Sequence, residues 1–254
     1  MNLKKLFRSA MAAVSFVAAA AANAGIVYAT GPSDPWGVTT NDAAMSAAFG
    51  ANNWTKRFGF NTGLFTGSTF VYLDGSDSNA DELSAFITGN QAVIENYVSG
   101  GGRLLINAAP NVGGSFHLGF GAELLYTQNQ YSANVTVTTD GVAAGLTNGN
   151  LATHYMGTSF GHALISGAGI SNLIQGDDVA GIIFGAKQFG SGVVAFGGQT
   201  TTNFHSPSAD ALKLRVNELL YVANAQNNQV PEPESLALFG IALAGMLLVR
   251  RRKT

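Results

Sequence analysis

Apolar residues in the central part of the chain recur with two periods, which indicate alternating strands and helices. Short runs rich in β-branched and aromatic residues predict strands at 25–30, 68–75 and 103–107. Between the last two runs, apolar residues recur every three or four positions and predict a helix that ends at Gly100. This strand–helix–strand order favours a parallel pair of strands with a right-handed crossover.

The second half of the pattern is richer in strands. Apolar runs predict strands within 122–127, 133–139, 162–167, 180–188 and 192–198, and Gly190 to Gly192 predict a hairpin between the last two. Helices are expected at 41–49, within 78–99 with Ser78 and Asp81 as a capping box, and at 206–224 with Ser206 as the cap before Pro207. Together these elements predict an α/β fold. We expect a three-layer sandwich with a mostly parallel central sheet and some antiparallel edge strands.

The amino-terminal segment does not fit this pattern and predicts a secretory signal peptide over residues 1–24. Basic residues precede an apolar stretch, and Ala22 and Ala24 form an A-x-A cleavage site. The mature chain is therefore expected to begin at Gly25, after cleavage by signal peptidase.

The carboxyl-terminal segment, 227–254, has three parts in order. A Pro-Glu-Pro turn precedes an apolar run from Ser235 to Val249, and a basic cluster follows. The turn comprises Val230, Pro231, Glu232 and Pro233, and the cluster comprises Arg250, Arg251, Arg252 and Lys253. The run is short for a bilayer core about 30 Å thick, but the flanking residues can complete a transmembrane helix whose basic end stays in the cytoplasm. The alternative is a buried terminal helix.

This tail resembles the PEP-CTERM sorting signal of Gram-negative bacteria. The resemblance implies that an exosortase cuts near the Pro-Glu-Pro motif after transient insertion in the inner membrane. The product would then reach the cell surface or the medium, often in bacteria that make exopolysaccharide. The apolar helix would then be part of a sorting signal that is cleaved from the mature protein, as in other carboxyl-terminal anchors that are removed.

Between the two terminal segments lies a single expected domain, residues 25–226. From 25 to 230 the chain carries six basic and thirteen acidic residues, a formal charge of −7. An acidic domain without a basic stripe argues against nucleic acid as a partner. The chain has no cysteine, which excludes a disulfide framework and a thiol nucleophile.

Three phrases of the central domain, "VIENYVSGGGRLLIN", "TTDGVAAGL" and "AKQFGSGVVAFGGQTTTNF", resemble class I glutamine amidotransferase-like domains, including the trehalose-utilisation-like group. The resemblance implies a flavodoxin-like fold. It does not imply the activity, because the nucleophilic cysteine is absent. "NFHSPS" places His205 near the position of the family's catalytic histidine, but Ser206 and Pro207 follow where the family has Pro-Glu.

Weak catalytic candidates remain in Asp74, Asp77 and His205, because ligands of open α/β sheets bind beyond the carboxyl ends of the strands. Each also has a structural interpretation, as a turn former or a residue of the loop before the last helix. No cofactor and no metal site is expected, since His117, His154, His162 and His205 lack metal-site spacing and Asp77-x-Asn79-x-Asp81 lacks the later ligands of a calcium loop. Six aromatic residues could line a sugar-binding surface or pack in the core: Trp36, Trp54, Phe58, Phe60, Phe65 and Phe116.

The leading hypothesis is a surface-sorted, non-catalytic α/β domain with a structural or binding role in the envelope or its exopolysaccharide. The first alternative is an atypical glycan hydrolase that uses Asp74, Asp77 and His205. The second is a carbohydrate-binding domain without catalysis.

Overall fold

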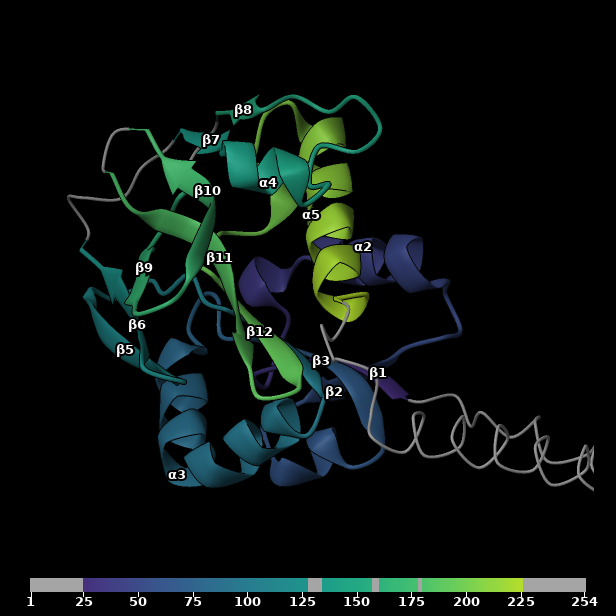
Figure 1. Ribbon diagram of the computed structural model, residues 1–254, viewed down its shortest axis with the longest axis vertical. Coiled ribbons are helices and arrows are strands. Elements are labelled where there is room, and N and C mark those ends of the chain that lie inside the picture. The colour runs from purple at the N-terminus through teal and green to yellow at the C-terminus, as the bar shows by residue number, and fades with distance from the viewer. Residues whose placement is uncertain (1–24, 128–133, 157–159, 178–179, 226–254) are drawn as a thin grey trace, which may run out of the picture.

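The computed structural model describes residues 25–127, 134–156, 160–177 and 180–225 (Figure 1). The strands are β1 (Gly25–Thr30), β2 (Thr55–Phe58), β3 (Ser68–Asp74), β4 (Arg103–Asn107), β5 (Gly114–Gly119), β6 (Ala122–Tyr126), β7 (Val135–Val137), β8 (His154–Tyr155), β9 (Leu164–Gly167), β10 (Ser171–Gly176), β11 (Ile182–Phe189) and β12 (Gly192–Gly197). The α-helices are α2 (Thr40–Phe49), α3 (Ala80–Ser99), α4 (Thr139–Ala143) and α5 (Ser208–Ala223), and the 3₁₀ helices are η1 (Pro35–Gly37), η2 (Thr62–Phe65) and η3 (Thr202–Phe204).

The expected signal peptide, the carboxyl-terminal sorting tail and the transmembrane helix predicted within that tail lie outside these residues. Within the described ranges, no helix has both the length and the apolar character needed to cross a membrane.

The described strands form one mixed sheet of 12 strands. Along its main path the order is β2-β1-β3-β4-β12-β11-β10-β7-β8, and a branch of β9, β6 and β5 starts from β11. Neighbouring strands from β2 to β12 on this path are parallel, whereas every pairing beyond β12 and in the branch is antiparallel.

The prediction of a mostly parallel three-layer, flavodoxin-like sandwich is therefore wrong. Parallel neighbours need a crossover of roughly a dozen residues or more, but several links in the second half of the chain are much shorter. Phe120–Gly121 joins β5 to β6, 168–170 joins β9 to β10, and Gly190–Ser191 joins β11 to β12. The links at 120–121 and 190–191 force the chain to turn back beside the preceding strand, and β9 and β10 both pair antiparallel with β11, so antiparallel strands make up far more than an edge of this sheet.

The predicted unit at 68–107 is confirmed. β3 and β4 are parallel neighbours from the Phe70–Arg103 pair to the Asp74–Asn107 pair, and α3 is the crossover between them. The hairpin predicted between the last two strands is also confirmed, because Phe189 of β11 pairs with Gly192 of β12.

Both predicted helix caps are displaced by one residue. Asn79 precedes α3 and Pro207 precedes α5, and neither makes a side-chain cap hydrogen bond. Ser206 instead exchanges two backbone hydrogen bonds with Met156, at 2.6 and 2.9 Å, which holds it in an extended bridge.

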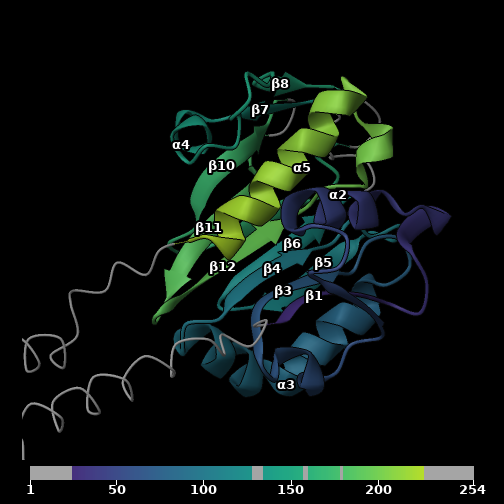
Figure 2. The ribbon, with the colours of Figure 1, turned by 90° about the vertical axis from the view of Figure 1, so that its right-hand side faces the viewer.

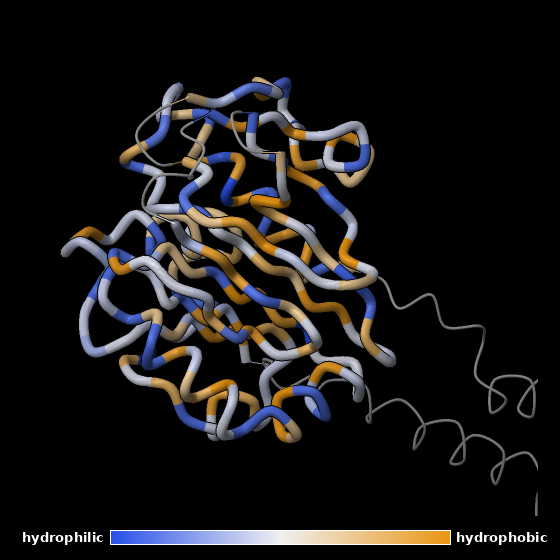
Figure 3. Tube along the Cα trace, turned by 90° about the vertical axis from the view of Figure 1, so that its left-hand side faces the viewer, coloured by the Kyte–Doolittle hydropathy of each residue, from blue (hydrophilic) through white to orange (hydrophobic). Residues whose placement is uncertain are grey.

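Helices cover both faces of the parallel strands and create two apolar cores (Figures 1 and 2). α3 lies over one face and buries Leu83, Ile87, Ile94 and Val98 against alternate residues of β3, β4 and β12. α2 and α5 lie over the other face, where Met45, Leu214 and Leu219 pack against Tyr28, Phe70, Tyr72 and Leu105. Figure 3 shows the hydrophobic stretches concentrated along the strands between these helices.

Candidate functional site

The carboxyl ends of four parallel strands meet in one row of paired residues. Thr30 of β1 is opposite Asp74 of β3, Asp74 is opposite Asn107 of β4, and Asn107 is opposite Gly197 of β12. Open α/β sheets place their ligands beyond this edge. We call this region the carboxyl edge.

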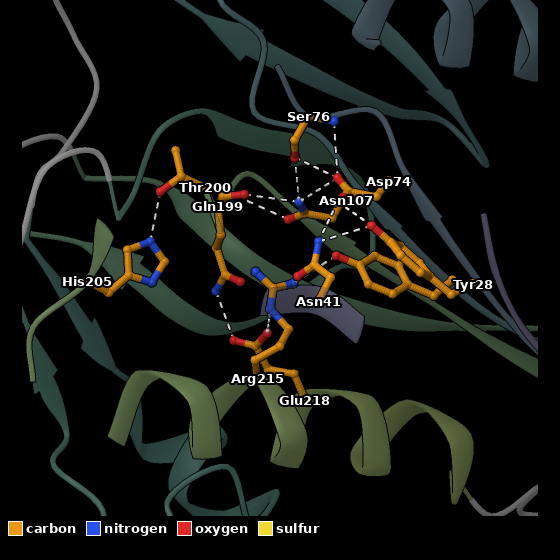
Figure 4. A network of polar contacts seen from close by, with 11 residues as sticks. Tyr28, Asn41, Asp74, Ser76, Asn107, Gln199, Thr200, His205, Arg215 and Glu218 are labelled. Atoms are coloured by element: carbon orange, nitrogen blue, oxygen red, sulfur yellow. Dashed lines mark hydrogen bonds and ion pairs between the residues drawn. The ribbon is translucent and has the colours of Figure 1, made fainter. Parts of the chain in front are cut away.

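Asp74 is fully buried at the centre of a polar network (Figure 4). Its Oδ1 accepts hydrogen bonds from Ser76 Oγ (2.6 Å), the Ser76 backbone N–H (3.0 Å) and Asn107 Nδ2 (3.3 Å). Its Oδ2 accepts from Asn41 Nδ2 (2.7 Å) and Tyr28 Oη (3.4 Å). Burial raises the pKa of Asp74, and the hydrogen bonds from Ser76 only partly oppose that shift. Both oxygens are thus occupied by protein donors.

Asn107 connects this centre to α5. Its Nδ2 donates to the carbonyl of Gln199 (3.0 Å), and its Oδ1 accepts from the Gln199 backbone N–H (3.2 Å). The Gln199 side chain in turn donates to Glu218 Oε1 (2.9 Å). The loop after β12 is therefore tied to both a strand end and a helix.

A buried ion pair of α5 closes the network. Arg215 Nε lies 3.3 Å from Glu218 Oε2 without hydrogen-bond alignment, and the two side chains are 2% and 1% exposed. Burial raises the pKa of Glu218 against the attraction of Arg215. Arg215 also attracts Asp74, so one buried cation faces two buried carboxyl groups. Such a group of charges is stable only while its members stay together.

His205 occupies a separate part of the carboxyl edge. Its Nε2 lies 2.8 Å from Thr200 Oγ1, and its ring stacks on Phe160 with centroids 3.9 Å apart. Burial lowers the pKa of His205 well below its usual value, so the ring is neutral at pH 7. A hydroxyl–imidazole pair is the core of nucleophilic hydrolases. Here both residues are buried, and His205 Nδ1 has no hydrogen-bond partner among the described residues, so the third group of a catalytic triad is missing from them.

Four residues form the outer surface of the carboxyl edge, which we call the rim: Trp36, Asp77, Asn111 and Phe204. Asp77 Oδ2 accepts from the Trp36 backbone N–H (2.9 Å), and Asp77 Oδ1 accepts from Asn111 Nδ2. The Trp36 and Phe204 rings meet edge to face with centroids 5.4 Å apart. Asn111 and Phe204 are exposed, and Trp36 and Asp77 are partly exposed.

The backbone of the rim is strained. Trp36 has a φ of 51° and Asp77 a φ of 62°, in the left-handed region, which is rare for a bulky residue such as tryptophan and less rare for aspartate. The two residues are joined by the hydrogen bond from Trp36 to Asp77. Strain of this kind costs about 1–3 kcal/mol per residue and is concentrated at functional sites.

The three candidates Asp74, Asp77 and His205 all lie at the carboxyl edge, but each has its own partners. Asp74 is bound by Asn41, Ser76 and Asn107, Asp77 belongs to the rim, and His205 pairs with Thr200. Asn107 and the Arg215–Glu218 pair were not predicted from the sequence. One signal could have revealed Asn107, because it ends the apolar run "RLLIN" as Asp74 ends "STFVYLD".

The histidines and aromatic residues are dispersed. His117 pairs with Glu123, His154 with Asp177, and His162 with the carbonyl of Pro110. In the part of the chain that the structure describes, no group of three or more metal-ligating side chains occurs. Of the six aromatic residues considered for a sugar-binding surface, Phe65 and Phe116 are buried, Phe60 stacks on Phe86, Trp54 contacts Tyr28, and Phe58 is exposed on the edge strand β2. Trp36 alone of the six belongs to the rim.

The comparison with protein families finds one match, to the family described as PEP-CTERM protein-sorting motif, over residues 229–253. The match supports the sorting tail and implies processing by an exosortase. The chain is exported across the inner membrane and, after processing, reaches the cell surface or the medium. No curated protein matches the chain.

Solved structures with a similar arrangement include a β-galactosidase from Bacillus circulans sp. alkalophilus (13% identity, TM-score 0.44, 79% of this chain and 31% of that chain). An exo-β-1,4-mannosidase from Opitutaceae bacterium strain TAV5 has 14% identity and a TM-score of 0.40, over 89% of this chain and 38% of that chain. A cytoplasmic protein from Salmonella typhimurium LT2 has 10% identity and a TM-score of 0.44, over 80% of this chain and 99% of that chain. The chain thus spans about a third of the two glycosidases, and we transfer no activity from them.

Proposed function

We propose that this exported protein acts at the cell surface as a non-catalytic binding domain, and that its rim holds the ligand. The observation that carries the proposal is the strained, hydrogen-bonded pair of Trp36 and Asp77 at the carboxyl edge. The fold maintains two left-handed backbone conformations there, next to an exposed phenylalanine, and such conformations are concentrated at functional sites.

The residues beneath the rim favour binding over acid–base catalysis. A general acid or base must reach the substrate within hydrogen-bond distance. Asp74 and Glu218 are 0% and 1% exposed, and protein donors occupy both oxygens of Asp74. His205 is 4% exposed and pairs with Thr200. Their burial shields these groups from a ligand at the rim.

A saccharide of the envelope suits the rim. The apolar face of a sugar ring packs on an aromatic side chain such as Trp36, and sugar hydroxyls bond to carboxylate and amide groups such as Asp77 and Asn111. An exported protein meets polysaccharide at the cell surface, which agrees with the location that the sorting motif indicates. An atypical glycan hydrolase that uses Asp74, Asp77 and His205 is the alternative, and the observation that favours it is the hydrogen bond between His205 and the hydroxyl of Thr200, at 2.8 Å.

The test uses the processed protein purified from its native host and surface polysaccharide from the same host, immobilised on a biosensor. We expect saturable binding, and Trp36→Ala should weaken it about tenfold or more, since stacking on an aromatic ring is worth roughly 1–3 kcal/mol. Phe58→Ala is the matched control, because Phe58 is 56% exposed but lies on β2, outside the rim. Equal binding by wild type and Trp36→Ala would contradict the proposal. Release of new reducing ends that Thr200→Ala abolishes would favour the hydrolase.

A further inference from the structure

A pocket of about 380 Å³ lies at the opposite end of the parallel strands from the rim. Gly25 and Val27 of β1 and Thr55 and Arg57 of β2 project from one face of the sheet, as alternate residues of paired strands do. The segment from Asn61 to Ser68, which contains η2, forms the other wall. The volume falls within the range of about 300–1,000 Å³ that is usual for small-ligand sites.

Among the side chains that line the pocket, only that of Arg57 carries a charge, and in the processed chain the α-amino group of Gly25 would add a second positive group. None of its ten lining residues is acidic, although the domain as a whole is strongly acidic. Four residues with hydroxyl or amide side chains also line the pocket: Thr55, Asn61, Thr66 and Ser68. A positive, hydroxyl-lined pocket in a domain of opposite charge provides a local attraction for an anion.

Arg57 is also the basic residue whose charge the fold does not use. The described part of the chain contains six basic residues, and five of them are directed to carboxylates or backbone carbonyls: Lys56 to Asp34 (2.5 Å) and Asp42 (2.8 Å), Arg103 to Ala225 (2.8 Å), Lys187 to Phe120 (2.5 Å), Lys213 to Asp210 (3.8 Å) and Arg215 to Glu218 (3.3 Å). Arg57 makes only a long contact of 3.4 Å with the carbonyl of its neighbour Lys56. Its guanidinium therefore keeps most of its donors for a ligand.

The two basic side chains of β2, those of Lys56 and Arg57, lie on opposite faces of the strand. Lys56 points to the face of α2, where two carboxylates neutralise it. Arg57, one residue later, points to the opposite face and into the pocket.

We infer that this pocket binds a sugar acid, with Arg57 holding the carboxylate and the hydroxyl and amide groups of the lining holding the sugar hydroxyls. A guanidinium binds a carboxylate through two parallel hydrogen bonds, which gives the arginine a specific role.

The site is separate from the rim, so the two proposals can fail independently. The test titrates the processed protein from its native host with D-glucuronate by calorimetry, and D-glucose and inorganic phosphate are the reference ligands. We expect glucuronate to bind at least about tenfold more tightly than either reference, because glucose lacks the charge and phosphate lacks the sugar ring with its hydroxyls. Trp36→Ala should leave glucuronate binding unchanged.

Variants of Arg57 make the test specific. Arg57→Ala should weaken glucuronate binding about tenfold or more. Arg57→Lys should have an intermediate affinity, because lysine keeps the positive charge but lacks the paired donors of the guanidinium. Lys213→Ala is the matched control, since it removes the same charge from an exposed position of α5, and its affinity should stay within about twofold of wild type. The inference is overturned if glucose or phosphate binds as tightly as glucuronate, if no glucuronate binds, or if Arg57→Ala binds like wild type.

Discussion

Replacing Asp74 by alanine tests whether the carboxyl edge is a closed structural network. The substitution removes an acceptor of five hydrogen bonds, given by Tyr28, Asn41, Ser76 (twice) and Asn107. Alanine has no side-chain acceptor for these donors. Water cannot replace the lost acceptor, because the site is enclosed and Asp74 is 0% exposed. Arg215 also loses one of the two carboxyl groups that it faces.

The expected loss of unfolding free energy is about 3–5 kcal/mol, the usual effect of removing one member of a buried charged group. Each unsatisfied buried donor costs about 1–3 kcal/mol, and neighbouring losses overlap, so the five do not add. Asp74→Asn should cost less, about 1–3 kcal/mol. Its new amide can donate to Asn41 if the Asn41 side chain turns over, because Asn41 Oδ1 has no hydrogen-bond partner in the described structure.

Urea unfolding followed by circular dichroism, with linear extrapolation to water, measures both losses. Asp140→Asn is the control, since Asp140 is exposed in the first turn of α4 and its loss should cost less than about 1 kcal/mol. A buried catalytic carboxylate behaves in the opposite way, because removing a strained functional group is often neutral or stabilising. An Asp74→Ala protein at least as stable as wild type would therefore refute the structural role.

Three further outcomes are expected. Burial lowers the pKa of His205, so the stability that depends on its neutral ring should be complete above the unfolded pKa of about 6.5 and should fall by up to about 1.4 kcal/mol per pH unit below it. In urea unfolding at pH 7 and pH 5, His205→Gln should lose less stability between the two pH values than wild type. An equal loss in both proteins would contradict this prediction. Gly192→Ala should destabilise the protein by at least about 1–3 kcal/mol, because the new Cβ would lie 2.1 Å from the carbonyl oxygen of Val98. Gly89→Ala in α3 should stabilise the protein by up to about 1 kcal/mol, because no atom lies within 4 Å of the new Cβ. Equal melting temperatures of the two variants and wild type would contradict both predictions. The intact mass of the protein released by its host should match a chain that starts at Gly25 and ends near Pro233, and a full-length mass would contradict processing at both ends.

Local pattern was enough to predict most of the elements that carry the carboxyl edge. The strands at 25–30, 68–75 and 103–107 agree with β1, β3 and β4 to within a residue, because each is an apolar run bounded by glycine or polar residues. β2 and β10 were missed for the converse reason. "TKRF" is a polar edge strand, and "SNLIQG" has only two adjacent apolar residues, so neither shows a strand period.

The sheet arrangement depended on pairings that the sequence pattern does not specify. The hairpin of β11 and β12 follows from the short link Gly190–Ser191, but the antiparallel pairing of β11 with β10 and β9, and of β10 with β7, joins apolar runs whose pattern does not select a partner. The site shows the same limit. Asp74 could be chosen from its place at a strand end, but Glu218 appeared to be an ordinary helical residue until the fold placed Gln199 and Arg215 beside it.

The most direct test of the rim follows the two tryptophans of the protein by NMR. Trp36 belongs to the rim, and Trp54 lies apart from it with its Nε1–H donating to Ser46 at 3.3 Å, so the two indole N–H signals report one candidate site and one internal control. Titration with fragments of the host's surface polysaccharide should shift the Trp36 signal, leave that of Trp54 in place, and leave the fragments intact. Unchanged signals, equal shifts of both, or cleavage of the fragments during the titration would contradict a non-catalytic binding rim.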